Sequence, residues 1–312
     1  MLSETIEQDP LGEDSPVEPV SPSQVTVVIP AFNEVQGIGD VVRELRQAFA
    51  EIMIVVVDDG STDGTRQAAL AAGAKVLRHK RNQGYGASLR TGMLAAATPY
   101  IAIYDADGQH RPEDLGRLIA HAASYDMVIG ERDKKSPQPL SRRPLKWMLG
   151  KVANLLSGQE IPDLNSGLRV MRRSVILRYL HLFPKGFSAS TTMTICMLQR
   201  GYEVRFEPVT TKLRLSGKSQ VKKVNDGLRT IRLMIRLVVL FNPQRFFLPP
   251  ALAMILLGGA YGLYKALVHQ QGIPVLAMLV VVTGLLTGLF GILADQISTL
   301  RIELFERDGT GA

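Results

Sequence analysis

The sequence predicts an α/β fold with a doubly wound, mostly parallel sheet, followed by two membrane-spanning helices. Between residues 25 and 215, apolar β-branched segments alternate with segments of helical periodicity, as in strand–helix–strand units. Polar clusters follow three of the apolar segments directly, where parallel sheets bind their ligands. Two long uncharged segments near the C-terminus are long enough to cross a bilayer.

The segment before the first predicted strand, residues 1–24, is acidic. It contains six acids, four prolines and no Lys or Arg, which is typical of a disordered tail. It lacks the basic start and apolar centre of a signal peptide. Because the whole chain carries +7 and this segment −6, the remainder carries +13, a balance that favours anionic partners.

The alternating elements can be assigned in order along the chain. Uninterrupted apolar, β-branched residues predict strands, and apolar residues at helical spacing predict the helices between them. The predicted strands are 24–32, 51–61, 75–80 and 100–107, and the predicted helices are 34–50, 63–74 and 85–97. Further along, residues 186–204 predict a packed helix that leads into a strand.

The segment IAIYDADGQH, residues 101–110, ends an apolar run with two acids. Side chains two residues apart in an extended segment point the same way, so Asp105 and Asp107 would share a small volume. Like charges that close raise each other's pKa unless a cation lies between them. A divalent cation, with Gln109 as a further oxygen ligand, is one interpretation. A solvated Asp-rich turn is the other, and the residues alone leave both open.

Common phosphate-binding motifs are missing from the expected places. No GxxxxGK[ST] follows the first strand and no GxGxxG opens the first helix, which disfavours an ATPase or a nicotinamide dehydrogenase. NQGYGASLRTG has two close glycines, which fit either a tight turn or a loop whose amides approach a nucleotide. The single cysteine, Cys196, fits a reducing compartment.

Two C-terminal segments, 246–264 and 273–294, contain 19 and 22 residues without a charge. The first would span roughly 29 Å as a helix, close to the ~30 Å thickness of the hydrocarbon layer. A transmembrane hairpin is therefore predicted, with a pair of buried core helices as the alternative. Nine Lys and Arg residues precede the first span between 212 and 245, whereas the loop offers only Lys265. Positive residues stay in the cytoplasm, so both termini and the large domain should be cytoplasmic.

The segment 221–241 mixes apolar residues with cations at near-helical spacing. It fits an amphipathic helix on anionic headgroups, or one packed on the domain. The predicted regions are a disordered tail at 1–24, a catalytic domain at 25–220, a juxtamembrane helix at 221–244, a hairpin at 245–295 with spans near 246–265 and 273–294, and a cytoplasmic tail at 296–312.

Seven motifs, taken in order, resemble those of a known enzyme family: VTVVIPAFNE, VVVDDGSTDGT, NQGYGASLRTG, YDADGQH, VIGER, DLNSGLRVMRR and RLSGKS. They resemble the family 2 glycosyltransferases of the GT-A fold. More narrowly, the chain is similar to the polyprenyl-phosphate glycosyltransferases, which include dolichol-phosphate mannose synthase and bacterial undecaprenyl-phosphate sugar transferases. The resemblance covers residues 25–220, and the C-terminal spans fit a membrane-anchored branch.

The resemblance implies roles for individual residues. It implies that Asp105, Asp107 and Gln109 hold Mg2+ or Mn2+ against the donor diphosphate, and that Asp105, Asp107, Arg132 and Asp163 form the catalytic set. The implied donor site adds Pro30, Phe32, Glu34, Asp58, Asp59, Gly84 and Ala106. The implied acceptor-phosphate site consists of Arg142, Arg143, Arg169 and Ser219.

Some of these assignments have open alternatives. Asp163 fits a base, a group that orients the acceptor arginines, or a helix cap or turn residue. Arg142 and Arg143 also fit a solvated surface. The chain departs from the family in GERDKKSPQP, where a GSR followed by glycines is common, and in SGKSQV, where Gln220 follows Ser219. These departures put the donor loop and one acceptor contact in question.

The implied reaction is inverting transfer of one sugar from a UDP- or GDP-sugar to a polyprenyl phosphate at the cytoplasmic membrane face. A lipid monophosphate is already largely ionised at neutral pH and needs charge compensation rather than a base. A transferase acting on a hydroxyl of a lipid-linked glycan would need Asp163 as a base. A non-catalytic membrane scaffold that binds nucleotide or lipid is a third possibility. No nucleic-acid partner is expected, and the formation of a homo-oligomer is left open.

Overall fold

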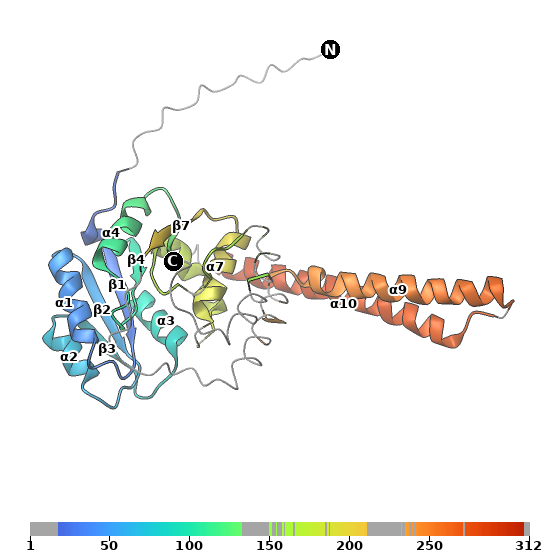
Figure 1. Ribbon diagram of the computed structural model, residues 1–312, viewed down its shortest axis with the longest axis horizontal. Coiled ribbons are helices and arrows are strands. Elements are labelled where there is room, and N and C mark those ends of the chain that lie inside the picture. Colours follow the sequence, from blue (N-terminus) through green and yellow to red (C-terminus); the bar gives the residue numbers. More distant parts are fainter. Residues whose placement is uncertain are drawn as a thin grey trace, which may run out of the picture.

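A seven-stranded mixed sheet forms the centre of the N-terminal domain, and a two-helix hairpin extends from that domain (Figure 1). The computed structural model describes residues 18–132, 150–151, 154, 158, 160–164, 166–184, 186, 188–210, 232, 235–236, 239, 241–270 and 272–308.

The strands lie in the order β3-β2-β1-β4-β6-β5-β7. β6 is antiparallel to its neighbours β4 and β5, and every other pairing is parallel. The predicted doubly wound, mostly parallel α/β sheet is therefore confirmed. The strands are β1 (Val25–Ala31), β2 (Met53–Asp58), β3 (Lys75–Arg78), β4 (Tyr100–Ile103), β5 (Met127–Arg132), β6 (Arg169–Arg172) and β7 (Val204–Val209).

Helices cover both faces of the sheet, with α1 and α2 on one side in Figure 1 and α3 and α7 on the other. Alternate residues of β1 enter the two cores, since Val27 and Ile29 join the first and Val28 the second. The helical elements are η1 (Pro22–Gln24), α1 (Ile38–Ala48), α2 (Thr65–Ala71), α3 (Tyr85–Ala95), α4 (Pro112–His121), α6 (Arg173–Arg178), η3 (Leu180–Leu182) and α7 (Ala189–Gln199).

The acid pair lies beyond the strand that was predicted to carry it. β4 ends at Ile103, so Asp105 and Asp107 occupy a turn rather than an extended segment. Gly108 has a φ of 71°, a conformation that glycine adopts without steric cost. The argument from extended-strand geometry was therefore wrong, and the turn itself sets how these carboxylates point.

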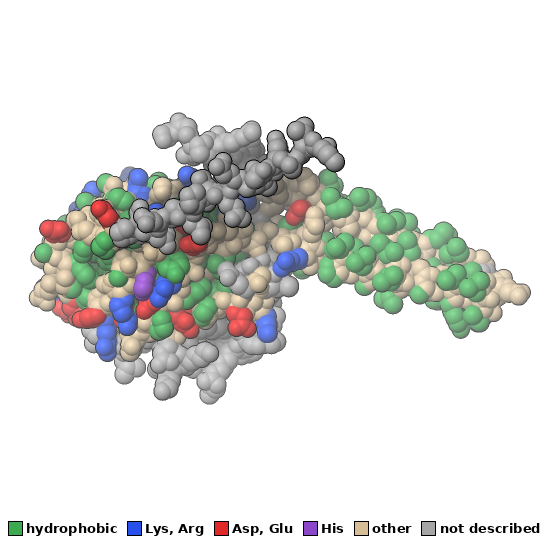
Figure 2. Space-filling view, turned by 90° about the horizontal axis from the view of Figure 1, so that it is seen from above, with side chains coloured by type: hydrophobic (Ala, Val, Ile, Leu, Met, Phe, Trp, Pro, Cys, Tyr) green, Lys and Arg blue, Asp and Glu red, His purple; other side chains and the backbone are tan. Residues whose placement is uncertain are grey.

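The C-terminal hairpin consists of α9 (Pro243–Val268) and α10 (Val275–Asp308). Segments of 26 residues in each, Pro243–Val268 and Val275–Leu300, are long and apolar enough to cross a membrane. In each helix only 17% of an 18-residue apolar stretch is buried. Hydrophobic side chains dominate the hairpin surface in Figure 2. This exposure does not fit the alternative of two buried core helices. Because α10 continues through Asp308, much of the predicted tail at 296–312 is helical.

Glycines let the two hairpin helices approach closely. A Cβ at Gly284 would lie 2.8 Å from the carbonyl oxygen of Ala251, and one at Gly258 would lie 3.1 Å from that of Ala277. Small residues at such crossings are a common means of packing helices in lipid. The helices thus approach each other at glycines that face side chains such as Ile255 and Phe247, while most of their large apolar side chains are exposed.

The predicted juxtamembrane helix at 221–244 lies mostly outside the described residues. Its described positions include helical residues at 232, 235, 236, 239 and 241. Arg236 donates a hydrogen bond to the carbonyl oxygen of Leu182 at 3.3 Å, and Phe241 packs against the core beneath α3, α6 and α7. This part of the segment therefore contacts the domain.

Candidate active site

The polar clusters predicted to form a site meet at one edge of the sheet. β1, β2, β4 and β5 point in the same direction. The segments that follow β1, β2 and β4, and the last residue of β5, Arg132, are therefore at the carboxyl ends of these strands. Open α/β sheets bind ligands at this edge.

Asp105 is held by groups from three separate segments. The hydroxyl of Tyr85, the first residue of α3, donates to its Oδ1 at 3.3 Å. His110 Nε2 lies 3.4 Å from its Oδ2. Gly167 faces the same carboxylate so closely that a Cβ there would be 1.9 Å from Oδ2. Only glycine fits at position 167 while Asp105 keeps this position.

The environment of Asp105 favours its ionised form. Burial, the largest influence, raises the pKa of Asp105. Hydrogen bonding and charge from His110, the Tyr85 hydroxyl and the positive charge of Arg132 together outweigh burial and leave this pKa below its usual value. Burial and the charge of Asp105 raise the pKa of Tyr85. The carboxylate is therefore charged and the phenol is protonated at neutral pH.

Asp107 and Gln109 lie in the same turn as Asp105. The backbone N–H of Gln109 donates to Asp107 Oδ1 at 3.2 Å, and both side chains are half-buried. Ala106 between the acids is 4% exposed and joins the core beneath α1. A contact between Ala106 and the donor would therefore involve its backbone, while the acids flanking it remain partly accessible.

The residues of this turn fit a divalent cation. Within the described part of the chain, no group of three or more His, Cys, Asp or Glu side chains is placed to hold a metal. Mg2+ characteristically uses one or two carboxylates and completes its shell with substrate phosphates and water. Two partly accessible acids just beyond β4, with Gln109 in the same turn, match that incomplete protein ligand set.

Arg132 and Asp163 form a bidentate ion pair beside the acids. Arg132 Nε donates to Asp163 Oδ2 at 2.7 Å, and Nη2 donates to Oδ1 at 3.0 Å. Asp163 is buried, whereas Arg132 is half-buried. Hydrogen bonding to Asp163 raises the pKa of Arg132, and the charges of Asp163, Asp105 and Asp107 add to this effect. Arg132 is thus a fixed cation near both acids.

Asp59 anchors the loop before α3. Its Oδ1 is 2.7 Å from His79 Nδ1 and accepts from the N–H of Gln83 at 2.9 Å, while Oδ2 accepts from the N–H of Gly84 at 2.8 Å. Gly84 has a φ of 100°, so glycine suits this turn. In the structure, Asp59 and Gly84 therefore stabilise the loop that leads into α3 beside the site.

The chain matches two family models, one within the sheet domain and one across the hairpin. Residues 26–180 match the model described as Glycosyl transferase family 2, and residues 242–300 match the GtrB C-terminal hairpin. The polyprenol monophosphomannose synthase of Mycolicibacterium smegmatis is 32% identical over 231 residues, which cover 69% of this chain and 86% of that protein. The chain belongs to glycosyl transferase family 2.

Other relatives of this glycosyltransferase extend the comparison. The undecaprenyl-phosphate mannosyltransferase of Micrococcus luteus is 30% identical over 64% of the chain and 87% of its own length. Glycosyltransferase AglJ of Haloferax volcanii is 28% identical over 92% of the chain and 98% of its own length. The second alignment reaches across the hairpin as well as the domain.

Solved structures show that the domain has the GT-A fold. Glucosyl-3-phosphoglycerate synthase from Mycobacterium tuberculosis, in complex with Mn2+, UDP and glucosyl-3-phosphoglycerate, superposes with a TM-score of 0.55. The match has 18% identity and covers 69% of this chain and 78% of that structure. At this identity the likeness concerns the fold.

The structure corrects the implied role of Arg169. In this glycosyltransferase the side chain is 0% exposed, and its guanidinium donates to the carbonyl oxygens of Ser166 and Ser190 and to the Thr194 hydroxyl, each at 3.0 Å. Burial lowers its pKa to about 10. An arginine so enclosed presents no surface to an acceptor phosphate in this conformation. Its contacts instead join β6 to α7.

The other predicted donor residues surround the ends of β1 and β2. Pro30 is the half-buried penultimate residue of β1, and Phe32 and Glu34 follow the strand half-buried. Asp58 is 1% exposed and its Oδ1 accepts from the N–H of Ser61 at 2.9 Å, which gives it a role in the turn after β2. The predicted acceptor residues Arg142, Arg143 and Ser219 lie outside the described residues.

Sequence reasoning missed two residues that shape the site. Tyr85 reaches Asp105 from a different element, and its position between two glycines was the available signal. Asn33 has a φ of 55°, and its Oδ1 accepts from the N–H of Thr62 at 3.0 Å. Asn tolerates this left-handed conformation better than most residues, and the bond ties the segments after β1 and β2 together.

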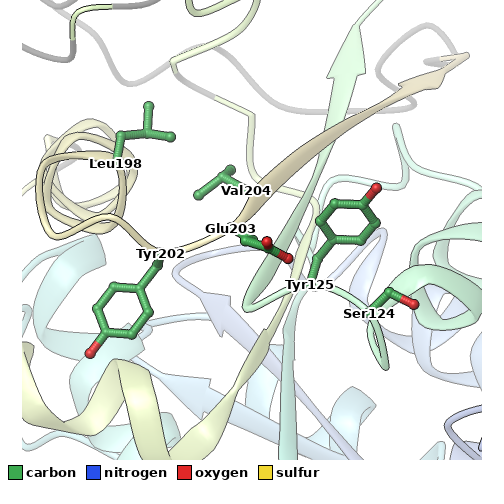
Figure 3. Close-up of a pocket in the computed structure, with 6 residues that line it drawn as sticks. All are labelled: Ser124, Tyr125, Leu198, Tyr202, Glu203 and Val204. Carbon is green, nitrogen blue, oxygen red and sulfur yellow. The ribbon is translucent and has the colours of Figure 1, made fainter. Parts of the chain in front are cut away.

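A surface hollow of about 530 Å3 lies away from this site (Figure 3). It is lined by Ser124, Tyr125, Leu198, Tyr202, Glu203 and Val204. Tyr125 precedes β5 and Val204 begins β7, so the hollow is at the amino ends of these parallel strands. It is therefore separate from the acids at the carboxyl ends.

Proposed function

We propose that this glycosyltransferase transfers one sugar, with inversion, from a UDP- or GDP-sugar to a polyprenyl phosphate at the cytoplasmic face of a membrane. The observation that carries the proposal is the position of Asp105, Asp107 and Arg132 together at the carboxyl ends of the parallel strands, in a chain that continues into two membrane-length helices. Relatives named for undecaprenyl phosphate and polyprenol support the acceptor class.

Asp105, Asp107 and Gln109 would hold Mg2+ or Mn2+. When bound there, the cation compensates the charge on the departing nucleoside diphosphate. Asp105 enters the reaction already ionised and held by Tyr85 and His110. Arg132, fixed by Asp163, supplies a cation beside the phosphates without a change of protonation state.

An oxygen of the acceptor phosphate attacks the anomeric carbon as the bond to the diphosphate oxygen breaks, and the departing diphosphate takes the electron pair. Because the acceptor is already ionised, the step needs no general base. Both oxygens of Asp163 accept hydrogen bonds from Arg132, which supports a positioning role for Asp163. A hydroxyl acceptor would require a base to remove its proton.

The proposed orientation of the protein in the membrane follows from the distribution of charge. Nine cations lie between 212 and 245, on the domain side of the hairpin. The positive-inside preference therefore favours a cytoplasmic domain and cytoplasmic termini. A polyprenyl phosphate in that leaflet would have its phosphate at the membrane surface, on the same side as the sheet edge that carries the acids.

The proposal can be tested with purified full-length protein. Radiolabelled UDP- and GDP-sugars are each offered with undecaprenyl or dolichyl phosphate and Mn2+, and the label is followed into organic solvent. We expect extraction of label with one nucleotide class, and release of the sugar by mild acid, as for a sugar phosphodiester. Asp107→Ala should abolish transfer, whereas Asp40→Ala, on an exposed face of α1, should retain it. Acid-stable lipid-linked label, or full activity in Asp107→Ala, would contradict the proposal.

A further inference from the structure

The Tyr85 hydroxyl makes and breaks no bond in the proposed reaction, yet it contacts both an acid of the site and the start of α7. It donates to Asp105 Oδ1 at 3.3 Å and also hydrogen-bonds the Ser190 side chain at the start of α7. We propose that the Tyr85 hydroxyl, held by Ser190, is a positioning group that fixes Asp105 in the orientation that binds the divalent cation. This inference rests on the proposed function, which assigns Asp105 to the cation.

The backbone that carries Tyr85 is fixed on both sides. Gly84 before it is tied to Asp59 through its N–H at 2.8 Å. Gly86 after it faces Pro184 and Ala189, since a Cβ on Gly86 would lie 2.0 Å from the Pro184 carbonyl oxygen and 3.0 Å from Ala189 Cβ. The start of α3 is therefore wedged between the segment after β2 and the start of α7, and the phenol has little freedom to move away.

Ser190 is equally well anchored. It is 4% exposed, and its carbonyl oxygen accepts from Arg169 Nη1 at 3.0 Å. The same Nη1 donates to the Thr194 hydroxyl one turn further along α7. The buried Arg169, which does not face an acceptor phosphate in this conformation, thus contacts α7. This helix carries Ser190, the hydrogen-bonding partner of Tyr85.

The two oxygens of Asp105 are consequently contacted by different groups. Tyr85 contacts Oδ1, whereas His110 approaches Oδ2 and Gly167 leaves the space that Oδ2 needs. The hydrogen bond from Gln109 to Asp107, by contrast, is local to the turn. Groups that orient a metal-binding side chain commonly contribute roughly 10- to 100-fold to metal affinity. Asp105 is therefore the pre-positioned acid of the pair.

Tyr85→Phe removes the hydroxyl and keeps the ring. Its matched control is Tyr179→Phe, which removes another buried hydroxyl, hydrogen-bonded to Tyr202 at 3.2 Å in the core beneath α6. Mn2+ is titrated into the full-length protein with UDP or GDP, and bound Mn2+ is measured by electron paramagnetic resonance. We expect affinity to fall about 10-fold in Tyr85→Phe, less in Ser190→Ala, and not in Tyr179→Phe.

Transfer assays give a second readout. The lower rate of Tyr85→Phe should recover as Mn2+ is raised, because the variant retains both acids. Tyr85→Phe or Ser190→Ala that binds Mn2+ within twofold of wild type overturns the inference, as does a rate defect that Mn2+ does not relieve. If Tyr85→Phe fails to fold, Ser190→Ala carries the test. Absence of saturable Mn2+ binding in the wild type would instead overturn the metal assignment of the proposed function, and this inference with it.

Discussion

The catalytic domain and the C-terminal hairpin use the same apolar residue types in opposite environments. Leu45 of α1 is 0% exposed, whereas Leu257 of α9 is 71% exposed. The domain buries its large side chains and joins polar groups across elements, as in the contact of Tyr85 with Asp105. The hairpin buries small residues such as Ala251, Gly258 and Ala277 between its helices, and most of its large apolar side chains are exposed. The surfaces of the two regions are therefore suited to different solvents. The domain surface suits water, and we propose that the hairpin surface faces lipid.

Glycines show the difference most directly. In the domain, Gly167 makes room for the carboxylate of Asp105, and in the hairpin Gly284 makes room for the backbone of α9 at Ala251. Gly167 leaves the space that a carboxylate of the site occupies, and Gly284 leaves the space in which the two hairpin helices cross. Substitutions at these positions should consequently affect different measurements.

The largest effect is expected at Gly167. In Gly167→Ala the new Cβ would meet Asp105 Oδ2 at 1.9 Å, so the acid must move, and a displacement of this size costs about 100-fold or more in rate. Sugar transfer into organic solvent measures the loss, and the membrane fraction should keep its normal share of protein. The control is Gly259→Ala in the hairpin, where a Cβ meets nothing within 4 Å. Near-normal transfer by Gly167→Ala would contradict the conclusion that Gly167 serves the site while Gly284 serves the contact between helices.

Asp163→Asn should have the next largest effect. It removes the negative charge that holds Arg132 through two hydrogen bonds, and a charge-assisted contact contributes about 1.5–3 kcal/mol. We expect transfer to fall roughly 10- to 100-fold, with Mn2+ binding retained.

The matched variant is Arg132→Gln, and the double variant should be little worse than either single one, because the residues act as a pair. Additive losses would show that they act separately. A far deeper loss in Asp163→Asn than in Arg132→Gln would favour a base and hence a hydroxyl acceptor.

Gly284→Leu is expected to affect the hairpin alone. Its Cβ would lie 2.8 Å from the Ala251 carbonyl oxygen, and overpacking of a tight contact costs about 1–3 kcal/mol. Thermal unfolding in detergent should therefore begin at a lower temperature, while UDP- or GDP-dependent Mn2+ binding by the domain stays normal. Gly259→Leu serves as the control at an open position of α9. Loss of Mn2+ binding in Gly284→Leu would show that the regions are coupled.

Leu257→Ala should have the smallest effect. A side chain that faces lipid loses little when shortened, so we expect a change within about 0.5 kcal/mol in stability. The same substitution at the buried Leu45 should cost roughly 2–5 kcal/mol because it leaves a cavity. Thermal unfolding of the two variants in the same detergent compares them. Equal losses would mean that α9 packs against protein on its outer face.

Local patterns predicted much of the fold. The segments that became β1 to β4, α1, α2 and α3 carried clear periodicity, and the hairpin followed from length and lack of charge. The antiparallel β6 between β4 and β5 was not predicted, because pairing between Ile101 and Met171 depends on residues far apart in the chain. Periodicity within a segment carries no information about its partner.

The candidate site was predicted less completely than the fold. The acid pair was identifiable because two carboxylates directly after an apolar segment are unusual, whereas Arg132 was assigned only through the resemblance of the GER motif to the family. The family resemblance assigned Arg169 and Asp59 to ligands, but both side chains are enclosed by hydrogen bonds within the protein. Whether a buried charge faces a ligand or a loop is decided by tertiary packing, which a single sequence does not reveal.

The contact between Gly167 and Asp105 also constrains how this enzyme can evolve. A side chain at 167 is compatible only with a shorter or displaced group at 105, so position 167 must stay glycine as long as Asp105 is kept in place. A descendant that abandoned catalysis would no longer need an acid at 105, and position 167 would then no longer need to be glycine. Paired replacement at these two sites would therefore be a mark by which inactive offshoots of the lineage could be recognised.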